Sequence, residues 1–256
     1  MAHKIYGLVG HPLGHSFSAP FFNARFEREG MDAEYRNYDL DCVDGLRRLV
    51  ETTPELCGLN VTIPYKEAVI PMLDALSETA AAIGAVNVIH ISRRADGGVF
   101  LTGHNTDVVG FDESFCALLR DAKAPRHALV LGTGGASKAA CYALRQAGLT
   151  VKRVSRSPKD DDTISYVSLR EPGVMERYKV IVNATPLGTY PNTDACPDIP
   201  YELLTPAHFC FDLVYNPPLT RFLHEASTHG CVLRNGLAML HTQALAAWAI
   251  WNALSV

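Results

Sequence analysis

The chain has 256 residues, of which 48% are hydrophobic and 20% are charged, and its formal net charge is −4. This composition is typical of a globular protein, and the acidic balance argues against a nucleic-acid partner, because nucleic-acid-binding surfaces are usually basic. No apolar run is long enough to span a bilayer and the first residues lack the zones of a secretory signal, so we expect a cytoplasmic protein with no membrane partner.

The cysteines are scattered and form no C-x-x-C pair. There are seven, at Cys42, Cys57, Cys116, Cys141, Cys196, Cys210 and Cys231. Zinc sites and redox-active cysteine couples usually contain such a pair, and an odd number cannot all be joined within one chain. We therefore expect reduced thiols and no metal site, which also suits the cytoplasm.

Short apolar segments bounded by turn residues alternate with helix-like segments along the chain. This alternation predicts an α/β fold with a parallel sheet flanked by helices. In the first half, we expect strands at residues 5–10, 33–40, 57–63, 87–91 and 99–102. We expect helices at residues 18–29, 43–52, 66–74 and 77–83.

Three polar clusters lie at the ends of predicted strands of the first half or just after them, at residues 14–18, 58–66 and 103–107. Hydroxyl and amide side chains at several strand ends make a polar pocket suited to a ligand with many hydroxyl groups. Each cluster also has a structural interpretation. Ser16 or Ser18 can be a helix N-cap, and Asn60 and Thr62 can be strand-edge residues.

A helix near residues 108–121 separates the two halves, and Pro125 marks the connector at residues 122–126. In the second half, we expect strands at residues 127–131, 151–155, 180–183, 210–213 and 232–233. A last helix at residues 237–254 is rich in Ala, Leu and Trp. We expect most of its surface to be buried, with both tryptophans as packing anchors.

A glycine-rich turn lies between the strand at residues 127–131 and a helical stretch that runs to Gln146. It reads Gly132, Thr133, Gly134, Gly135 and Ala136. Glycines let the backbone approach a pyrophosphate, and a helix N-terminus offers free N–H groups to it. Ser137 replaces the third glycine of the usual motif, and a tight packing turn is the alternative. The flanking strand and helix favour a dinucleotide site.

The next strand ends in Ser155-Arg156-Ser157-Pro158-Lys159, where an NAD enzyme usually carries an acid. Arg156 can pair with the 2′-phosphate of NADP, which a carboxylate would repel. The sequence therefore favours NADP over NAD. Against this interpretation, residues 160–162 are aspartates, and an ordinary exposed arginine is the alternative.

Taken together, the motifs of this chain resemble those of the shikimate dehydrogenase family. In one order it carries an N-terminal serine motif, N-x-T-x-P-x-K at residues 60–66, N-T-D at 105–107, G-x-G-G-A-S at 132–137, N-A-T-P-x-G at 183–188 and G-x-x-M-L-x-x-Q at 236–243. They extend from Gly10 to Gln243, which is nearly the whole chain. The resemblance implies an enzyme that reduces 3-dehydroshikimate to shikimate with NADPH, on the route to aromatic amino acids.

The same resemblance implies two domains and a set of ligand contacts. Residues 1–107 would form an α/β substrate domain completed by residues 237–256, and residues 108–236 a Rossmann-like, doubly wound NADP domain. Substrate contacts would come from Ser16, Ser18, Asn60, Thr62, Asn87, Thr106, Asp107, Tyr215 and Gln243. NADP contacts would come from Gly132, Thr133, Gly134, Gly135, Ala136, Ser155, Arg156, Ser157, Lys159, Asn183, Thr185, Leu213, Gly236 and Met239, with Glu78 as a weaker candidate.

Oxidation of an alcohol needs a group that manages the hydroxyl proton. The resemblance assigns this role to Lys66 and gives Asp107 the orienting role; an exposed lysine at a helix start and a helix-capping aspartate are the alternatives. We rank four histidines near the same motifs lower as proton carriers: His11, His15, His104 and His241. The chain departs from the family at Ala19-Pro20, where the serine motif usually continues differently.

Three other functions stay open at this point. The chain could also accept quinate or NAD, it could be a silent NADP sensor, or it could be a folate-linked dehydrogenase. A silent sensor should have lost Lys66 or Asp107, and a pteridine fits the polar clusters less well than a hydroxylated ring does. We expect a monomer or a homodimer.

Overall fold

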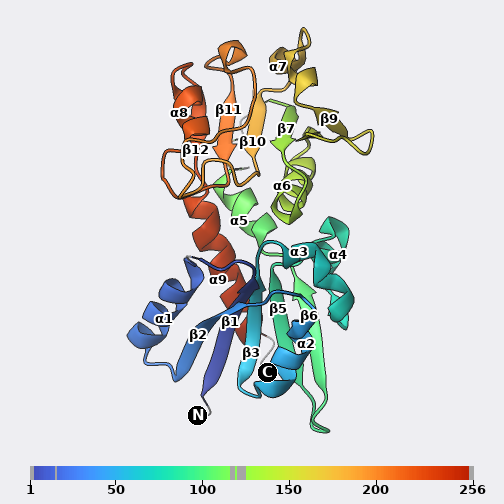
Figure 1. Ribbon diagram of the computed structural model, residues 1–256, viewed down its shortest axis with the longest axis vertical. Helices are drawn as coiled ribbons and strands as arrows, with labels where there is room; N and C mark the ends of the chain where they lie inside the picture. The colour runs from blue at the N-terminus through green and yellow to red at the C-terminus, as the bar shows by residue number, and fades with distance from the viewer. Residues whose placement is uncertain (1–2, 15, 116–118, 120–124, 254–256) are drawn as a thin grey trace. The chain divides into compact units, whose positions relative to one another are not determined.

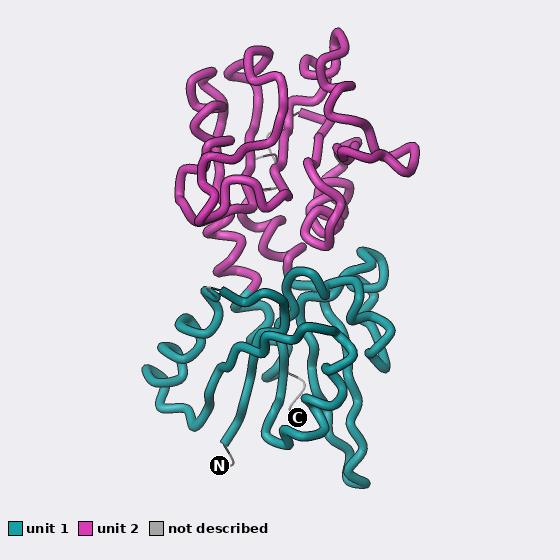
Figure 2. The backbone as a smooth tube through the Cα atoms, in the orientation of Figure 1, with its two compact units in different colours: residues 1–106, 244–256 teal, residues 107–243 magenta. Residues whose placement is uncertain are grey.

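The structure is a computed structural model that describes residues 3–14, 16–115, 119 and 125–253 (Figure 1). The chain divides into two compact units (Figure 2). Unit 1 comprises Met1–Thr106 and Ala244–Val256, and unit 2 comprises Asp107–Gln243. None of the helices in these described ranges is both long and apolar enough to cross a membrane.

Unit 1 is built on a six-stranded sheet in the order β2-β1-β3-β5-β6-β4. Its strands are β1 (Lys4–Gly10), β2 (Ala33–Asp39), β3 (Leu56–Val61), β4 (Ala75–Leu76), β5 (Val88–Arg93) and β6 (Val99–His104). Its helices are α1 (Ser18–Glu29), α2 (Gly45–Thr52), α3 (Tyr65–Ala68), the 3-10 turn η1 (Ile70–Met72) and α4 (Glu78–Ile83), together with the second part of α9 (Leu237–Ala253).

This sheet is mixed, whereas the alternation in the sequence predicted a parallel one. β5 runs antiparallel to both β3 and β6. Only residues 94–98 connect β5 to β6. A parallel pair needs a crossover of a dozen or more residues, so this short connection can only form a hairpin.

The helix expected at residues 66–74 is also shorter than predicted. α3 ends at Ala68 and is followed by η1, with Pro71 in its first turn. A proline has no N–H to continue a helix and its ring crowds the preceding turn. β4 has only two residues and carries no alternation by which the sequence could reveal it.

The two faces of the unit 1 sheet have separate cores. One contains Val9, Leu59 and Ile89 among other aliphatic side chains. The other is aromatic and joins Tyr6 and Phe22 to Trp251 of α9. These contacts confirm the tryptophan as a packing anchor, as do the ring contacts of Trp248 with Tyr6 and Phe26. The expectation that most of α9 is buried is wrong in part, because a stripe that includes Leu237 and Leu245 is exposed.

Unit 2 has an all-parallel sheet in the order β12-β11-β10-β7-β8-β9. Its strands are β7 (His127–Leu131), β8 (Thr150–Ser155), β9 (Thr163–Ser165), β10 (Val180–Asn183), β11 (Phe209–Asp212) and β12 (Val232–Arg234). Its helical elements are α5 (Asp107–Ser114), α6 (Gly135–Gln146), η3 (Val167–Arg170), α7 (Val174–Arg177), η4 (Tyr201–Leu203), α8 (Arg221–Ser227) and the first part of α9. Counted from β7, the order is 3-2-1-4-5-6, the arrangement of doubly wound dinucleotide-binding folds.

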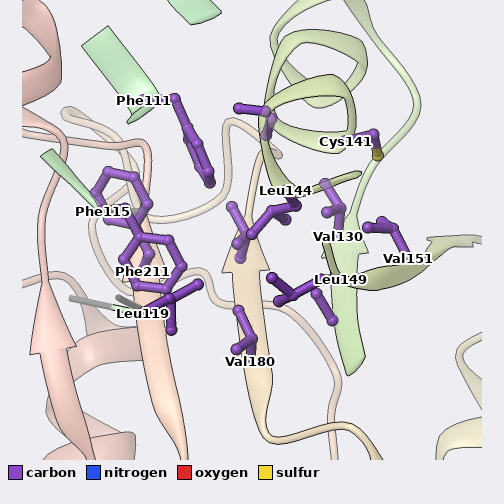
Figure 3. Close-up of a cluster of buried hydrophobic side chains, with 14 of the residues drawn as sticks. Phe111, Phe115, Leu119, Val130, Cys141, Leu144, Leu149, Val151, Val180 and Phe211 are labelled. Carbon is purple, nitrogen blue, oxygen red and sulfur yellow. The ribbon is translucent and has the colours of Figure 1, made fainter. Parts of the chain in front are cut away.

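Hydrophobic clusters cover both faces of the unit 2 sheet. In one of them, shown in Figure 3, Phe111, Phe115 and Phe211 pack ring against ring. Phe111 belongs to α5, which ends at Ser114. Most of the helix predicted beyond that point, like most of the connector at residues 122–126, lies outside the described residues.

Candidate active site

The turn between β7 and α6 is shaped to receive an anion. Gly132 has a φ of 106°, which residues with a side chain rarely adopt. Gly134 is the N-cap residue of α6, and a Cβ at this position would meet no atom within 4 Å. The N-terminus of the helix therefore borders open space at Gly134, where its N–H groups and positive dipole end favour an anion such as a pyrophosphate.

Ser137 explains why the third glycine of the motif is dispensable here. Its side chain is buried, and its hydroxyl donates to the carbonyl oxygen of Gly132 at 2.7 Å. This hydrogen bond joins the first turn of the helix to the start of the loop. The serine thus adds a hydrogen bond that stabilises the turn, whereas a glycine at this position would only allow close packing.

The loop after β10 lies beside this turn. Ala184 N donates to Leu131 O at 3.0 Å, and a Cβ on Gly132 would lie 3.2 Å from Ala184 O. β7 lies between β8 and β10, so both loops stand where the strand order reverses. Ligands of open α/β sheets bind at this switch point. The structure therefore brings residues 132–136 together with Asn183 and Thr185.

The end of β8 presents an exposed cationic turn. Ser155 Oγ accepts a hydrogen bond from Ser157 N at 3.1 Å, which bends the chain at Arg156. Arg156 and Lys159 are exposed, and among the described residues no carboxylate forms an ion pair with either. These side chains fit the predicted contact with a 2′-phosphate.

Three further cofactor candidates lie near the ends of β11 and β12. Leu213 N donates to Asn183 O at 2.9 Å, which ties the two neighbouring loops together. A Cβ on Gly236 would lie 2.1 Å from Leu213 O, so only glycine fits there. Met239, one turn along α9, is buried in the core of unit 2.

In unit 1, a chain of hydrogen bonds joins the predicted substrate residues. Tyr35 OH donates to Asn60 Oδ1 at 2.7 Å, and Asn60 Nδ2 donates to Asn87 O at 3.2 Å. Asn87 Nδ2 donates to Thr106 Oγ1 at 3.0 Å, and Thr106 N donates to Asn87 Oδ1 at 2.7 Å. The ends of β3 and β6 and the start of β5 are thus held together by buried polar groups.

The serine motif does not cap α1. The N-cap residue is Phe17, without a side-chain capping bond, so the helix-cap alternative for Ser16 and Ser18 is wrong. Ser18 is buried and hydrogen-bonds to Tyr35, whose pKa burial raises. Ser16 Oγ is buried and has no hydrogen-bond partner among the residues that the structure describes. An orphaned buried hydroxyl is costly, and a substrate hydroxyl could satisfy it.

The two predicted catalytic residues lie in the first turns of short helices. Lys66 is half-buried in α3, and its carbonyl oxygen accepts a bond from Val86 N at 2.7 Å, next to Asn87. Asp107 is buried as the first residue of α5 and directly follows Thr106. Asp107 belongs to unit 2, as do Tyr215 and Gln243, whereas the other substrate candidates belong to unit 1.

The remaining candidates have structural contacts of their own. His11 Nδ1 lies 2.7 Å from Asp39 Oδ1 near the surface. His104 has a buried Nε2 without a partner, and burial lowers its pKa. His241 is exposed on α9, and His15 lies outside the described residues. Glu78 is exposed at the start of α4, where an acid stabilises the helix dipole.

The sequence did not reveal three buried polar residues at these sites. Tyr35 lies in the middle of β2 and carries no signal of its function. Asp212 and Thr220 hydrogen-bond to each other at the end of β11. A charged residue that ends an apolar strand was a signal that could have identified Asp212. In the described part of the chain, no cluster of three or more His, Cys, Asp or Glu side chains could hold a metal ion.

Residues 8–89 match the family model of the shikimate dehydrogenase substrate-binding domain. A shikimate dehydrogenase (NADP(+)) of Caldanaerobacter subterraneus subsp. tengcongensis is 34% identical, over 97% of this chain and 91% of the relative.

Two solved structures are similar along nearly the whole chain. The shikimate 5-dehydrogenase of Thermus thermophilus, in complex with NADP(H) and shikimate, is 35% identical with a TM-score of 0.81, over 98% of this chain and 94% of that one. The quinate dehydrogenase of Corynebacterium glutamicum, in complex with NAD, is 29% identical with a TM-score of 0.84, again over 98% and 94%.

Proposed function

This chain belongs to the shikimate dehydrogenase family, and from that premise we propose that it catalyses the reversible NADPH-dependent reduction of 3-dehydroshikimate to shikimate. The observation that carries the proposal is the switch point of unit 2, where a glycine turn and a helix N-terminus suit the pyrophosphate of NADP and the exposed Arg156 suits its 2′-phosphate.

Most of the proposed substrate contacts come from unit 1. Shikimate is a ring with several hydroxyl groups and a carboxylate, and the hydrogen-bonded residues Asn60, Asn87 and Thr106 hold a rigid polar framework. Within the described ranges, the hydroxyl of Ser16 has no hydrogen-bond partner. We assign substrate contacts to these four residues and to Ser18, Thr62, Tyr215 and Gln243. Polar groups held in place in this way suit a ligand that carries several hydroxyl groups.

Lys66 is the proposed proton carrier. In the direction of oxidation, its amine accepts the proton of the reacting hydroxyl, and in the direction of reduction its ammonium returns that proton. Asp107 orients the hydroxyl and the lysine. Bound NADP supplies hydride acceptance and donation. Residues 132–136, Arg156 and Lys159 hold its phosphates, and Asn183 and Thr185 border the same switch point.

A quinate dehydrogenase that uses NAD is the second candidate, because a solved enzyme of that kind has the same fold at 29% identity. Arg156 argues against the NAD version, since an acid at this position usually binds the ribose hydroxyls of NAD. We propose a cytoplasmic location, supported by the free thiols of the six described cysteines.

A spectrophotometric assay tests the function. Purified protein is mixed with shikimate or quinate and with NADP⁺ or NAD⁺, and absorbance at the wavelength of the reduced nicotinamide is followed. We expect the highest kcat/KM with shikimate and NADP⁺. Faster turnover of quinate with NAD⁺ would favour the second candidate, and no turnover with any of the four pairs would contradict both.

A further inference from the structure

Three polar side chains are completely buried where β10 and β11 end. Asn183, Asp212 and Thr220 are each 0% exposed. The side chain of Asp212 has no exposed surface, and it hydrogen-bonds to Asn183, Val214 and Thr220. Burying a carboxylate is unfavourable unless hydrogen bonds compensate it, so its contacts should explain what it does.

Both oxygens of the Asp212 carboxylate accept hydrogen bonds from the loops around it. Asn183 Nδ2 donates to Oδ1 at 2.9 Å, and Val214 N donates to the same oxygen at 3.0 Å. Thr220 Oγ1 donates to Oδ2 at 2.5 Å. One side chain thus binds the loop after β10, the loop after its own strand, and the residue that caps α8.

The bond to Asn183 fixes the orientation of its amide. Because Nδ2 donates to Asp212, Oδ1 must point the other way, where it accepts from Thr185 N at 3.1 Å and from Thr185 Oγ1 at 2.6 Å. Nδ2 also donates to Leu187 O at 3.4 Å. The conformation of residues 183–187 therefore depends on an acceptor at position 212.

This loop is the one that borders the phosphate turn. A Cβ on Gly132 would lie 3.2 Å from Ala184 O and 3.3 Å from the Thr185 methyl group. A rotation of the Asn183 amide would release Thr185, and the wall of the switch point would move with it. Burial raises the pKa of Asp212 to about 6, which means that the buried charge is energetically unfavourable. A side chain that only filled space at this position would not carry that cost.

We propose that Asp212 is a positioning residue for the cofactor, whose carboxylate holds residues 183–187 in the conformation that binds NADP. The inference rests on the proposed function, because it takes the loops after β7 and β10 as the NADP site. Asp212 acts through Asn183 and Thr185 and makes no contact with the ligand.

The test compares Asp212→Ala with Asp212→Asn in the full-length protein. The Kd of NADP⁺ is measured by isothermal titration calorimetry, and the KM of shikimate at saturating NADP⁺. We expect Asp212→Ala to raise the Kd about tenfold or more and to change the KM of shikimate less than about twofold. Asparagine keeps an oxygen for Asn183 and Val214, while Thr220 can reverse its hydroxyl. Asp212→Asn should therefore stay within about threefold of the wild-type Kd.

His208→Ala is the matched control. His208 is equally buried at the opposite end of β11, and its imidazole hydrogen-bonds to Thr205 and Met175. The variant His208→Ala should lower the midpoint of thermal unfolding and leave the Kd of NADP⁺ unchanged. An unchanged Kd in Asp212→Ala, or an equal rise in His208→Ala, would overturn the proposal.

If Asp212→Ala does not fold, the titration uses Thr220→Val. A rise in the Kd of about threefold then supports the proposal, and an unchanged Kd refutes it.

A failure of the proposed function gives a different result. In that case the wild-type protein itself binds no NADP⁺, and hydrogen exchange of the backbone amides at residues 183–187 replaces the titration. Faster exchange there in Asp212→Ala than in Asp212→Asn supports a positioning role for the carboxylate. Equal exchange in the two variants overturns it.

Discussion

Three aspartates follow Arg156 closely in the sequence, and their negative charges argue against a phosphate site at this position. In the structure, two of the three carboxylates pair with other arginines. Asp160 pairs with Arg153 at 2.6 Å, and Asp162 pairs with Arg145 at 3.0 Å. Arg145 belongs to α6, so its contact with residue 162 exists only once α6 packs beside β8. The sequence alone was enough to predict that Arg156 could bind a phosphate. The ion pairs of the neighbouring aspartates could not be predicted, because they depend on the folded structure.

Arg156→Ala should weaken NADP⁺ binding far more than NAD⁺ binding. A charge-assisted hydrogen bond contributes about 1.5–3 kcal/mol, so we expect the Kd of NADP⁺ to rise roughly 10- to 100-fold. The Kd of NAD⁺ should change less than about threefold, because NAD⁺ has no 2′-phosphate. Arg170→Ala, which removes an exposed arginine paired with Asp198, controls for the change in net charge. Equal losses for both cofactors would contradict the phosphate clamp.

Lys66→Ala should slow turnover by a factor on the order of 10² to 10⁴, the usual contribution of a general acid or base. The KM of shikimate should change less, because Asn60, Asn87 and Thr106 stay hydrogen-bonded to one another in the variant. Steady-state kinetics at saturating NADP⁺ measure both quantities. Lys152→Ala, in β8, serves as the charge-matched control. A kcat near the wild-type value would remove Lys66 from the mechanism.

At the scale of elements, the longer helices and strands were predictable because hydrophobic pattern and turn residues agree locally. The sequence predicted α1 with both ends correct, and β7 and β10 as well. It did not predict β4, β9, α7 or α8, which have two to seven residues and too few repeats for a period to show. The hairpin of β5 and β6 was missed for another reason, since strand direction depends on connection length and not on pattern.

Gly58→Ala should destabilise the protein by about 1–3 kcal/mol, the usual cost of overpacking. A Cβ on Gly58 would lie 2.3 Å from Nε1 of Trp251, which donates to Ile89 O at 3.1 Å. The methyl group must therefore displace α9 or break that hydrogen bond. Chemical denaturation compares it with Gly45→Ala, where the added Cβ would come no closer than 3.9 Å to Leu40. Equal free energies of unfolding for the two variants would show that α9 can move away from the added methyl group without loss of stability.

At the scale of the whole molecule, one boundary between the two units lies inside the continuous helix α9. The structure divides the chain after Thr106 and after Gln243, whereas the sequence suggested changes after residues 107 and 236. The first seven residues of α9 belong to unit 2 and the rest to unit 1. No sequence pattern marks this change, because the helical period continues through it. The functional roles of the two domains stay a prediction.

Buried histidines in both units should make the protein less stable in mild acid. Burial lowers the pKa of His90 and His104 in unit 1 and of His208 in unit 2. A histidine with a lowered pKa in the folded state prefers to be neutral there. Its contribution to stability is complete above the unfolded pKa of about 6.5 and is lost as the pH falls below that value. Asp212 acts in the opposite direction, since its raised pKa favours the folded state as the pH falls through about 6.

With three histidines against one carboxyl group, the midpoint of thermal unfolding should fall between pH 7.5 and pH 5.5. The decrease should be smaller in His208→Gln. In the wild type, Nδ1 of His208 accepts from Thr205 N at 3.0 Å and Nε2 donates to Met175 O at 2.9 Å, so only the neutral ring fits both bonds. Glutamine does not titrate. His224→Gln, at an exposed position on α8, should keep the wild-type slope. A slope in His208→Gln as steep as that of the wild type would show that protonation of this ring does not oppose folding.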